Sequence, residues 1–145
     1  MSNRQIHWVH GCTVKGETTN PANLAAEDFG TRATAGSPPP HLVRIAVPCP
    51  TRINGVEGKA HHAYLKYRAY GPGNIMIVRL MDGVNLVETW PPPTFPPHVP
   101  GAVTQLSLPV QPTVNIESGL ALSIELFLPA GSTVDIIGAG VEVSY

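Results

Sequence analysis

The sequence predicts an all-β fold: a single-domain antiparallel β-sandwich of jelly-roll type, spanning residues 1–145, with about eight to ten strands. Three observations predict it. Apolar and polar residues alternate over several segments, an Asp-Gly dipeptide separates two strand-like segments, and 16 prolines and 14 glycines supply many turns. A chain of 145 residues is typical of one domain and can fold without cross-links.

The clearest alternation lies near the C-terminal end. Leucine or isoleucine occupies every second position from 120 to 128, so one face of this strand is expected to pack on the core. Residues 129–132 end the run, and residues 133–145 are expected to form another strand. Gly138 and Gly140 within it indicate a bulge or a close approach of another segment.

Further strands are expected at residues 6–15, 28–35, 41–47, 61–70, 102–108 and 113–116. Between the first two, residues 22–27 are expected to form one helical turn. Asn20 would cap this turn, and Pro21 would take its first position, where the missing N–H costs nothing.

Residues 75–81 and 84–90 flank Asp82-Gly83, the dipeptide that a two-residue type I′ turn favours because both central residues need positive φ. Arg79 and Glu88 would then be diagonal neighbours that can form an ion pair. The predicted register pairs Met81 with Val84, Arg79 with Leu86, Ile77 with Glu88, and Ile75 with Trp90.

Both faces of this hairpin are largely apolar, so one is expected to pack on the core while the other needs a cover. The charged content of 13% is well below the roughly 25% that is usual, which favours a homo-oligomer over the proline-rich segment 91–100 as that cover. The expected interface residues are Ile75, Ile77, Leu86 and Trp90, or, on the opposite face, Met76, Val78 and Val87.

One strand face carries aromatic and basic side chains. His62, Tyr64, Lys66, Arg68 and Tyr70 share it, and Ala63, Leu65, Tyr67 and Ala69 share the other. The first set is a candidate strip for binding a sugar, an anion or a protein, with Tyr64 and Arg68 as ligand-binding residues. Alternatively, it is a solvent-facing surface whose long side chains cover apolar neighbours.

Trp90 and Phe95, among the prolines of 91–100, form a second candidate site. Exposed, these rings could stack on a sugar or dock a partner. Buried, they would cap one end of the sandwich.

Composition excludes several classes of partner. The net charge of −1, the pI near 6.6 and the lack of a polybasic run argue against binding to nucleic acid or to a membrane surface. No apolar run approaches the ~20 residues of a membrane span, and no signal-peptide pattern occurs, so a cytoplasmic location is the default expectation. Cys12 and Cys49 form no C-x-x-C pair and are expected to be small, at least partly buried thiols, whose pairing the sequence leaves open.

The titratable residues predict no metal site, cofactor or catalytic centre. His7 and His10, like the neighbours His61 and His62, are expected to point to opposite strand faces, and no His-x-His pair occurs. No G-x-S-x-G elbow is present, and Asp82 is expected in a turn. The other carboxylates, read as solvent-facing, are Glu88, Glu125, Asp135 and Glu142.

Short segments in order along the chain carry a family resemblance: Trp8-Val9-His10-Gly11, Gly30-Thr31, Ile45-Ala46-Val47-Pro48-Cys49-Pro50, Asp82-Gly83, Gly119-Leu120-Ala121-Leu122-Ser123-Ile124 and Gly138-Ala139-Gly140. Together they resemble a small bacterial family of all-β domains of unknown function. The resemblance implies a single-domain β-sandwich and supplies no catalytic residues. The chain departs from it at Leu42 and Val43, where an aromatic residue is usual, and in the proline cluster 91–100.

These observations predict a non-enzymatic, self-associating binding or structural module. One alternative is a carbohydrate-binding, lectin-like module whose stacking candidates are Tyr64, Trp90 and Phe95. The other is a small jelly-roll enzyme with a histidine-based metal site at His10, His61 or His62.

Overall fold

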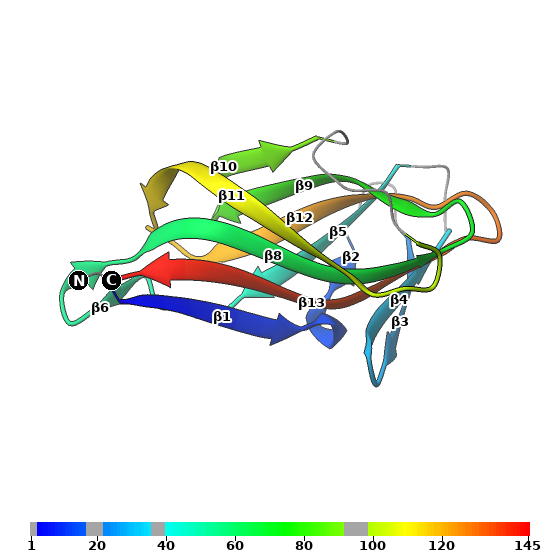
Figure 1. Ribbon diagram of the computed structural model, residues 1–145, viewed down its shortest axis with the longest axis horizontal. Helices are drawn as coiled ribbons and strands as arrows, with labels where there is room; N and C mark the ends of the chain where they lie inside the picture. The colour runs from blue at the N-terminus through cyan, green and yellow to red at the C-terminus, as the bar shows by residue number, and fades with distance from the viewer. Residues whose placement is uncertain (1–2, 17–21, 36–39, 92–98) are drawn as a thin grey trace.

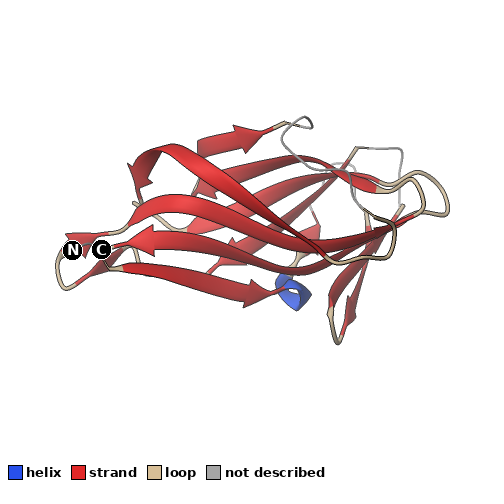
Figure 2. Ribbon diagram, in the orientation of Figure 1, coloured by secondary structure: helices blue, strands red, loops and turns tan. Residues whose placement is uncertain are grey.

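The computed structural model describes residues 3–16, 22–35, 40–91 and 99–145 (Figure 1). The strands are β1 (Arg4–His10), β2 (Lys15–Gly16), β3 (Asn23–Glu27), β4 (Gly30–Thr34), β5 (His41–Val47), β6 (Arg52–Ile53), β7 (Val56–Glu57), β8 (Lys59–Tyr70), β9 (Asn74–Asp82), β10 (Asn85–Trp90), β11 (Thr104–Asn115), β12 (Leu120–Phe127) and β13 (Thr133–Ser144). The one helix within these ranges is a 3-10 turn, η1 (Gly11–Thr13), drawn in blue in Figure 2. No helix in this part of the chain is long and apolar enough to cross a membrane.

The strands form two stacked antiparallel sheets. Sheet A has the order β11-β8-β13-β4-β3, and β1 pairs with β13 beyond the end of β4. Sheet B has the order β10-β9-β12-β5-β2, and β6 and β7 form a separate hairpin. The chain passes between the sheets at most connections, so β4-β13-β8-β11 faces β5-β12-β9-β10. This order is that of a jelly roll and confirms the predicted fold class.

The core lies between the sheets, and the alternating segments fill it as predicted. Positions 120, 122, 124, 126 and 128 are all buried, whereas 121, 123 and 125 on the other face of β12 are half-buried. On β8, the face that begins with Ala63 and Leu65 is buried and the face with Tyr64 and Lys66 is partly open. One face of each sheet therefore remains available at the surface.

The N-terminal segment departs from the prediction of one strand over residues 6–15. It pairs with β13 up to His10 and then turns into η1, and the chain continues as β2 in sheet B. At the break, Gly11 lies so close to the backbone of β13 that a Cβ atom there would overlap the carbonyl oxygen of Ile136. Only glycine lets the chain leave sheet A at this point.

Two further segments also differ from expectation. The predicted helical turn over 22–27 is wrong, because Asn23–Glu27 is β3 and pairs with β4, so sheet pairing overrides the local preference. Its predicted cap, Asn20, and Pro21 lie outside the described residues. The predicted strands at 102–108 and 113–116 are one strand, β11, whose register on β8 shifts between Pro109 and Val114.

The hairpin of β9 and β10 is present, but its predicted register is wrong. Asp82 pairs with Asn85, so the two loop residues are Gly83, with φ of 61°, and Val84. A bulge at Val87 shifts the register again, and Trp90 lies opposite Val78 instead of Ile75. The expected pairing of Arg79 with Glu88 is replaced by an ion pair between Arg79 and Glu125 on β12, at 3.4 Å.

The reason for the shifted turn is the carboxylate of Asp82. It is almost fully buried and accepts backbone hydrogen bonds from Glu117 at 2.7 Å and from Ser118 and Gly119 at 2.8 Å. These contacts hold Asp82 as the last residue of β9 and tie the hairpin to the segment before β12. Burial acts to raise the pKa of Asp82, but the three N–H donors outweigh it and lower the pKa below its ordinary value.

We expect Asp82→Asn to lower the free energy of unfolding at pH 7 by about 2 kcal/mol, because an amide N–H₂ would oppose the Glu117 N–H. Since the folded-state pKa is depressed, the stabilisation is present above the unfolded-state pKa and is lost as the pH falls through the folded-state pKa. Urea unfolding at neutral pH and at about pH 3 measures this. The difference from wild type should shrink in acid. Asp28→Asn, at an exposed turn, is the control. An equal loss in both variants would contradict this role for Asp82.

Candidate functional site

The outer face of sheet A carries a row of aromatic rings, which we call the aromatic row: Trp8 on β1 and His62 and Tyr64 on β8. The ring centroids of Trp8 and Tyr64 are 5.7 Å apart with planes inclined by 32°, and those of His62 and Tyr64 are 6.1 Å apart and stacked at 19°. Trp8 is 42% exposed, a high value for so large an apolar side chain. The row is therefore an open surface of aromatic rings.

The row forms because β13, which lies between β1 and β8, has no side chain at Gly140. Trp8 and Tyr64 both pair with Gly140, one from each side. A Cβ atom on Gly140 would lie 2.9 Å from the Trp8 indole, so the missing side chain lets the indole lie over the strand. The glycine pattern of β13 thus marks a close approach, as the sequence predicts, and the register of β13 on β8 shifts between Ile136 and Gly138.

Charged groups frame the aromatic row. The Lys66 ammonium lies 5.0 Å from the Trp8 ring centre. At the other end, the Glu142 carboxylate lies 3.2 Å from His62 Nδ1 and 3.4 Å from Arg4. Partial burial, and then the charge of Glu142, raise the pKa of Tyr64, so its phenol stays neutral and can donate or accept a hydrogen bond.

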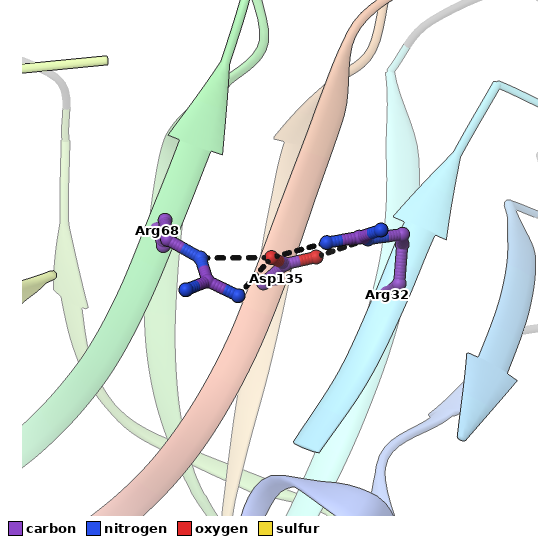
Figure 3. Close-up of polar contacts among 3 residues, drawn as sticks. All are labelled: Arg32, Arg68 and Asp135. Atoms are coloured by element: carbon purple, nitrogen blue, oxygen red, sulfur yellow. Dashed lines mark hydrogen bonds and ion pairs between the residues drawn. The ribbon is translucent and has the colours of Figure 1, made fainter. Parts of the chain in front are cut away.

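Further along the same face, β4, β13 and β8 place Arg32, Asp135 and Arg68 directly opposite one another (Figure 3). Arg32 donates to Asp135 at 2.8 and 3.1 Å, and Arg68 donates at 2.9 and 3.0 Å. Both guanidiniums also lie over the rings of Phe29 and Tyr70, at 4.9 to 6.0 Å. We call these five residues the arginine cluster.

Asp135 corrects one prediction from the sequence. Strand alternation placed it on a solvent-facing position, and it does point to the outer face of sheet A. Its exposed fraction is nevertheless 0%, because the two arginines cover it. A carboxylate without access to water is stable only when it is paired, and here Arg32 donates to both of its oxygens while Arg68 donates twice to Oδ2.

The predicted ligand-binding residues separate in space. Tyr64 and Arg68 lie on the outer face of sheet A, in the aromatic row and the arginine cluster. Trp90 is 5% exposed, belongs to the core and donates its indole N–H to the carbonyl of Pro109 at 3.1 Å. It is therefore a buried ring at the sheet B edge and not a surface platform. Phe95 lies outside the described residues.

The predicted interface residues also separate. Ile75 is 2% exposed and packs in the core with Trp90, because a bulge in β9 at Met76 turns Ile75 inward. Ile77 is half-buried on the outer face of sheet B, and Leu86 is 57% exposed on β10. In the alternative set, Val78 is fully buried, whereas Met76 and Val87 are half-buried. Neither set forms one continuous exposed face.

Sequence reasoning missed Trp8, Phe29 and Arg32 as members of this face. A pattern in the sequence points to Trp8. It lies in the first predicted strand, and Gly138 and Gly140 indicate that a large group comes close to β13. Phe29 and Arg32 carry no such signal, because only the pairing of β4 with β13 brings them to Arg68.

The histidines and cysteines that the structure describes form no comparable site. His10 accepts from the N–H of Cys12 at 3.2 Å, and His61 bonds to Ser144 at 2.7 Å. His61 contacts Ser144 and His62 contacts Glu142, and these two partners share a face of β13. The prediction that His61 and His62 point to opposite faces is therefore wrong. The cause is a shift in the pairing register of β8 and β13 at His61. Within the described ranges, no three His, Cys, Asp or Glu side chains gather as a metal site would require.

A hollow of about 610 Å³ lies where β1 and η1 approach β5 and β12. Val9, Ala46, Cys49 and Ala121 are among its lining residues, so its walls are mostly small and apolar. Cys12 is exposed and Cys49 half-buried, and both are free thiols. Burial raises the pKa of Cys49, which keeps this thiol protonated at neutral pH.

Comparisons with known proteins give one structural likeness. No protein-family model matches the chain, and no curated protein matches it. The fold is similar to a crystal structure of the CBM36-1 domain of a multidomain xylanase from the hindgut metagenome of Trinervitermes trinervoides. The two share 15% sequence identity with a TM-score of 0.45, over 96% of each chain.

We expect Gly140→Ala to displace the Trp8 indole, because the new methyl group would lie 2.9 Å from it. The indole is half-exposed and can move, so the free energy of unfolding should fall by only about 1 kcal/mol. The Trp8 contribution to fluorescence should shift to longer wavelength. Gly16→Ala is the matched control, since its Cβ would meet only Leu24 at 3.6 Å. An unchanged spectrum for Gly140→Ala would show that the glycine does not position the indole.

Proposed function

We propose that this protein is a non-enzymatic carbohydrate-binding module that holds sugar rings on the aromatic row of sheet A. The observation that carries the proposal is the pair of neighbouring rings of Trp8 and Tyr64, of which the Trp8 indole lies over the side-chain-free backbone of Gly140. Charged groups at both ends of the row complete the surface.

The chemistry of a sugar fits such a surface. One face of a pyranose ring presents C–H groups, which pack on a flat aromatic ring, and its edge presents hydroxyls. Lys66 and the Tyr64 phenol can bond to hydroxyls at the edge, and the Glu142 carboxylate can accept from them. The rings are held by a rigid sheet, so little conformational entropy is lost on binding.

Binding uses the groups that this face supplies, whereas glycoside hydrolysis needs two carboxyl groups free to act on the sugar. Of the carboxylates on this face, Asp135 has no exposed surface, Glu142 is held between Arg4 and His62, and the exposed Glu27 lies on the edge strand β3, away from the aromatic row. The arrangement therefore favours recognition over bond cleavage.

The test is a panel of neutral and acidic polysaccharides in affinity electrophoresis, followed by isothermal titration with oligosaccharides of the best ligand. We expect Trp8→Ala to weaken binding about tenfold or more, because it removes the most exposed ring of the row. Tyr64→Ala should act in the same direction.

Phe127→Ala is the matched control, because Phe127 is 38% exposed on β12, in the other sheet. It should bind like wild type, and circular dichroism should show that all three variants keep their strand content. If no polysaccharide binds, or if Trp8→Ala binds as tightly as wild type, the proposal is wrong.

Self-association is a second candidate, with β10 as the interface. This edge strand and its turn expose Val84 by 93% and Leu86 by 57%. A second copy that pairs along β10 would cover both side chains and satisfy the open edge of sheet B.

We expect Leu86→Asp to dissociate such an assembly while leaving the strand content intact, because a charge would be buried in the interface. Light scattering after size exclusion measures this against multiples of 15.4 kDa. Val56→Asp, at an exposed residue of the β6–β7 hairpin, is the control. A monomeric wild-type protein would exclude self-association.

A further inference from the structure

We infer that the sugar bound by the aromatic row belongs to an acidic polysaccharide, whose carboxylate or sulfate group binds the arginine cluster. The inference rests on the function proposed above, since it extends the same surface along β8. The aromatic row recognises the ring, and the arginine cluster selects the charge.

The donors of the arginine cluster are only partly used. Each guanidinium has five N–H groups in a planar fork. Arg32 and Arg68 both donate to Asp135 through Nε and Nη2. Among the described residues, neither Nη1 group makes a hydrogen bond to the protein. The side chains are 39% and 23% exposed, so solvent, or an anion, can reach them.

The cluster holds these donors in place before any ligand arrives. Asp135 pins both guanidiniums, and the rings of Phe29 and Tyr70 lie against them. Two arginines and one carboxylate leave one positive charge in excess, next to the rings of Phe29 and Tyr70. A fixed fork of this kind suits the planar geometry of a carboxylate and also bonds to sulfate oxygens.

The position of the cluster matches a chain-like ligand. Tyr64, Lys66 and Arg68 are successive outward residues of β8 and lie on one face. At about 3.3 Å per residue, Tyr64 and Arg68 are roughly 13 Å apart along the strand, with the Lys66 ammonium between them. A polymer lying along β8 would place one sugar on the rings and the charged group of a nearby sugar at the guanidiniums.

One acidic group opposes this charge. Glu27, at the end of β3, is exposed and lies near enough to act on Arg32, whose pKa is raised mainly by Asp135 and also, more weakly, by Glu27. Removing the charge of Glu27 should therefore strengthen the binding of an anion. This change lies at the surface and leaves the buried pairing of Asp135 intact.

The experiment compares polymers that share a backbone and differ in charge. Polygalacturonate and its methyl ester test a carboxylate, and dextran sulfate and dextran test a sulfate. Inorganic sulfate tests whether a free anion suffices. Titrations of the full chain at low and high salt give the affinity of each polymer.

We expect wild type to bind one charged polymer at least about tenfold more tightly than its neutral counterpart. Arg68→Gln should abolish that preference, and Glu27→Gln should raise the affinity about twofold to fivefold. Arg52→Gln is the matched control: it removes an equal charge from an exposed pair with Glu57 on the β6–β7 hairpin. It should change nothing.

The outcomes separate the two proposals. Trp8-dependent binding of neutral and charged polymers with equal affinity would overturn the inference and leave the proposed function standing. Equal losses for Arg52→Gln and Arg68→Gln would also overturn it, since the effect would be one of net charge. If the Arg68→Gln variant does not fold, the Glu27→Gln variant provides the test by itself, and an affinity equal to that of wild type would overturn the inference. Two results would contradict both the proposed function and this inference. One is binding of inorganic sulfate or of a charged polymer with an affinity that Trp8→Ala leaves unchanged, and the other is no binding at all.

Discussion

The ion pairs of Asp135 are the constraint on which the outer face of sheet A depends. A carboxylate on β13 that no water reaches has to be paired, and its partners come from the strands on either side, Arg32 on β4 and Arg68 on β8. The pairing fixes β4 next to β13 and brings β3 with it. It also turns two long basic side chains into a rigid surface. One buried charge thus determines strand neighbours and surface chemistry together.

The rest of this face follows from what β13 lacks. Beyond Asp135 the outer positions of β13 include Gly138 and Gly140, which carry no side chain, and Trp8 on β1 and Tyr64 on β8 meet at this point. Sheet B has a different outer face, where Arg79 forms an ion pair with Glu125 and the residues directly opposite these two on the neighbouring strand are Ser123 and Ile77. The two sides of the sandwich are therefore chemically distinct, although a single core joins them.

Sequence periodicity predicted what depends on one strand and its core. The buried face of β12, the two faces of β8 and the limits of β5 are as expected. Features that depend on distant partners were not predictable. The local sequence predicts that Asp82 is a turn residue. In the structure its carboxylate accepts hydrogen bonds from the N–H groups of residues 117–119, and the two-residue loop of the hairpin lies one residue later than predicted. The burial of Asp135 and the grouping of Phe29, Arg32 and Arg68 likewise require the sheet order, which no local pattern encodes. The resemblance to a bacterial family of unknown function stays a prediction.

The pairing of β1 with β13 has a mechanical consequence. Arg4 lies opposite Ser144, and the N–H of Tyr145 donates to the carbonyl of Asn3, so the first and last described residues leave the sandwich side by side (Figure 1). In an antiparallel ladder the hydrogen bonds run perpendicular to the strands. Tension applied at these two points would open the ladder one bond at a time, as a zip opens, and would peel β1 away under a small load. A load applied along β8 would instead be shared by every bond that this strand makes to β11 and β13.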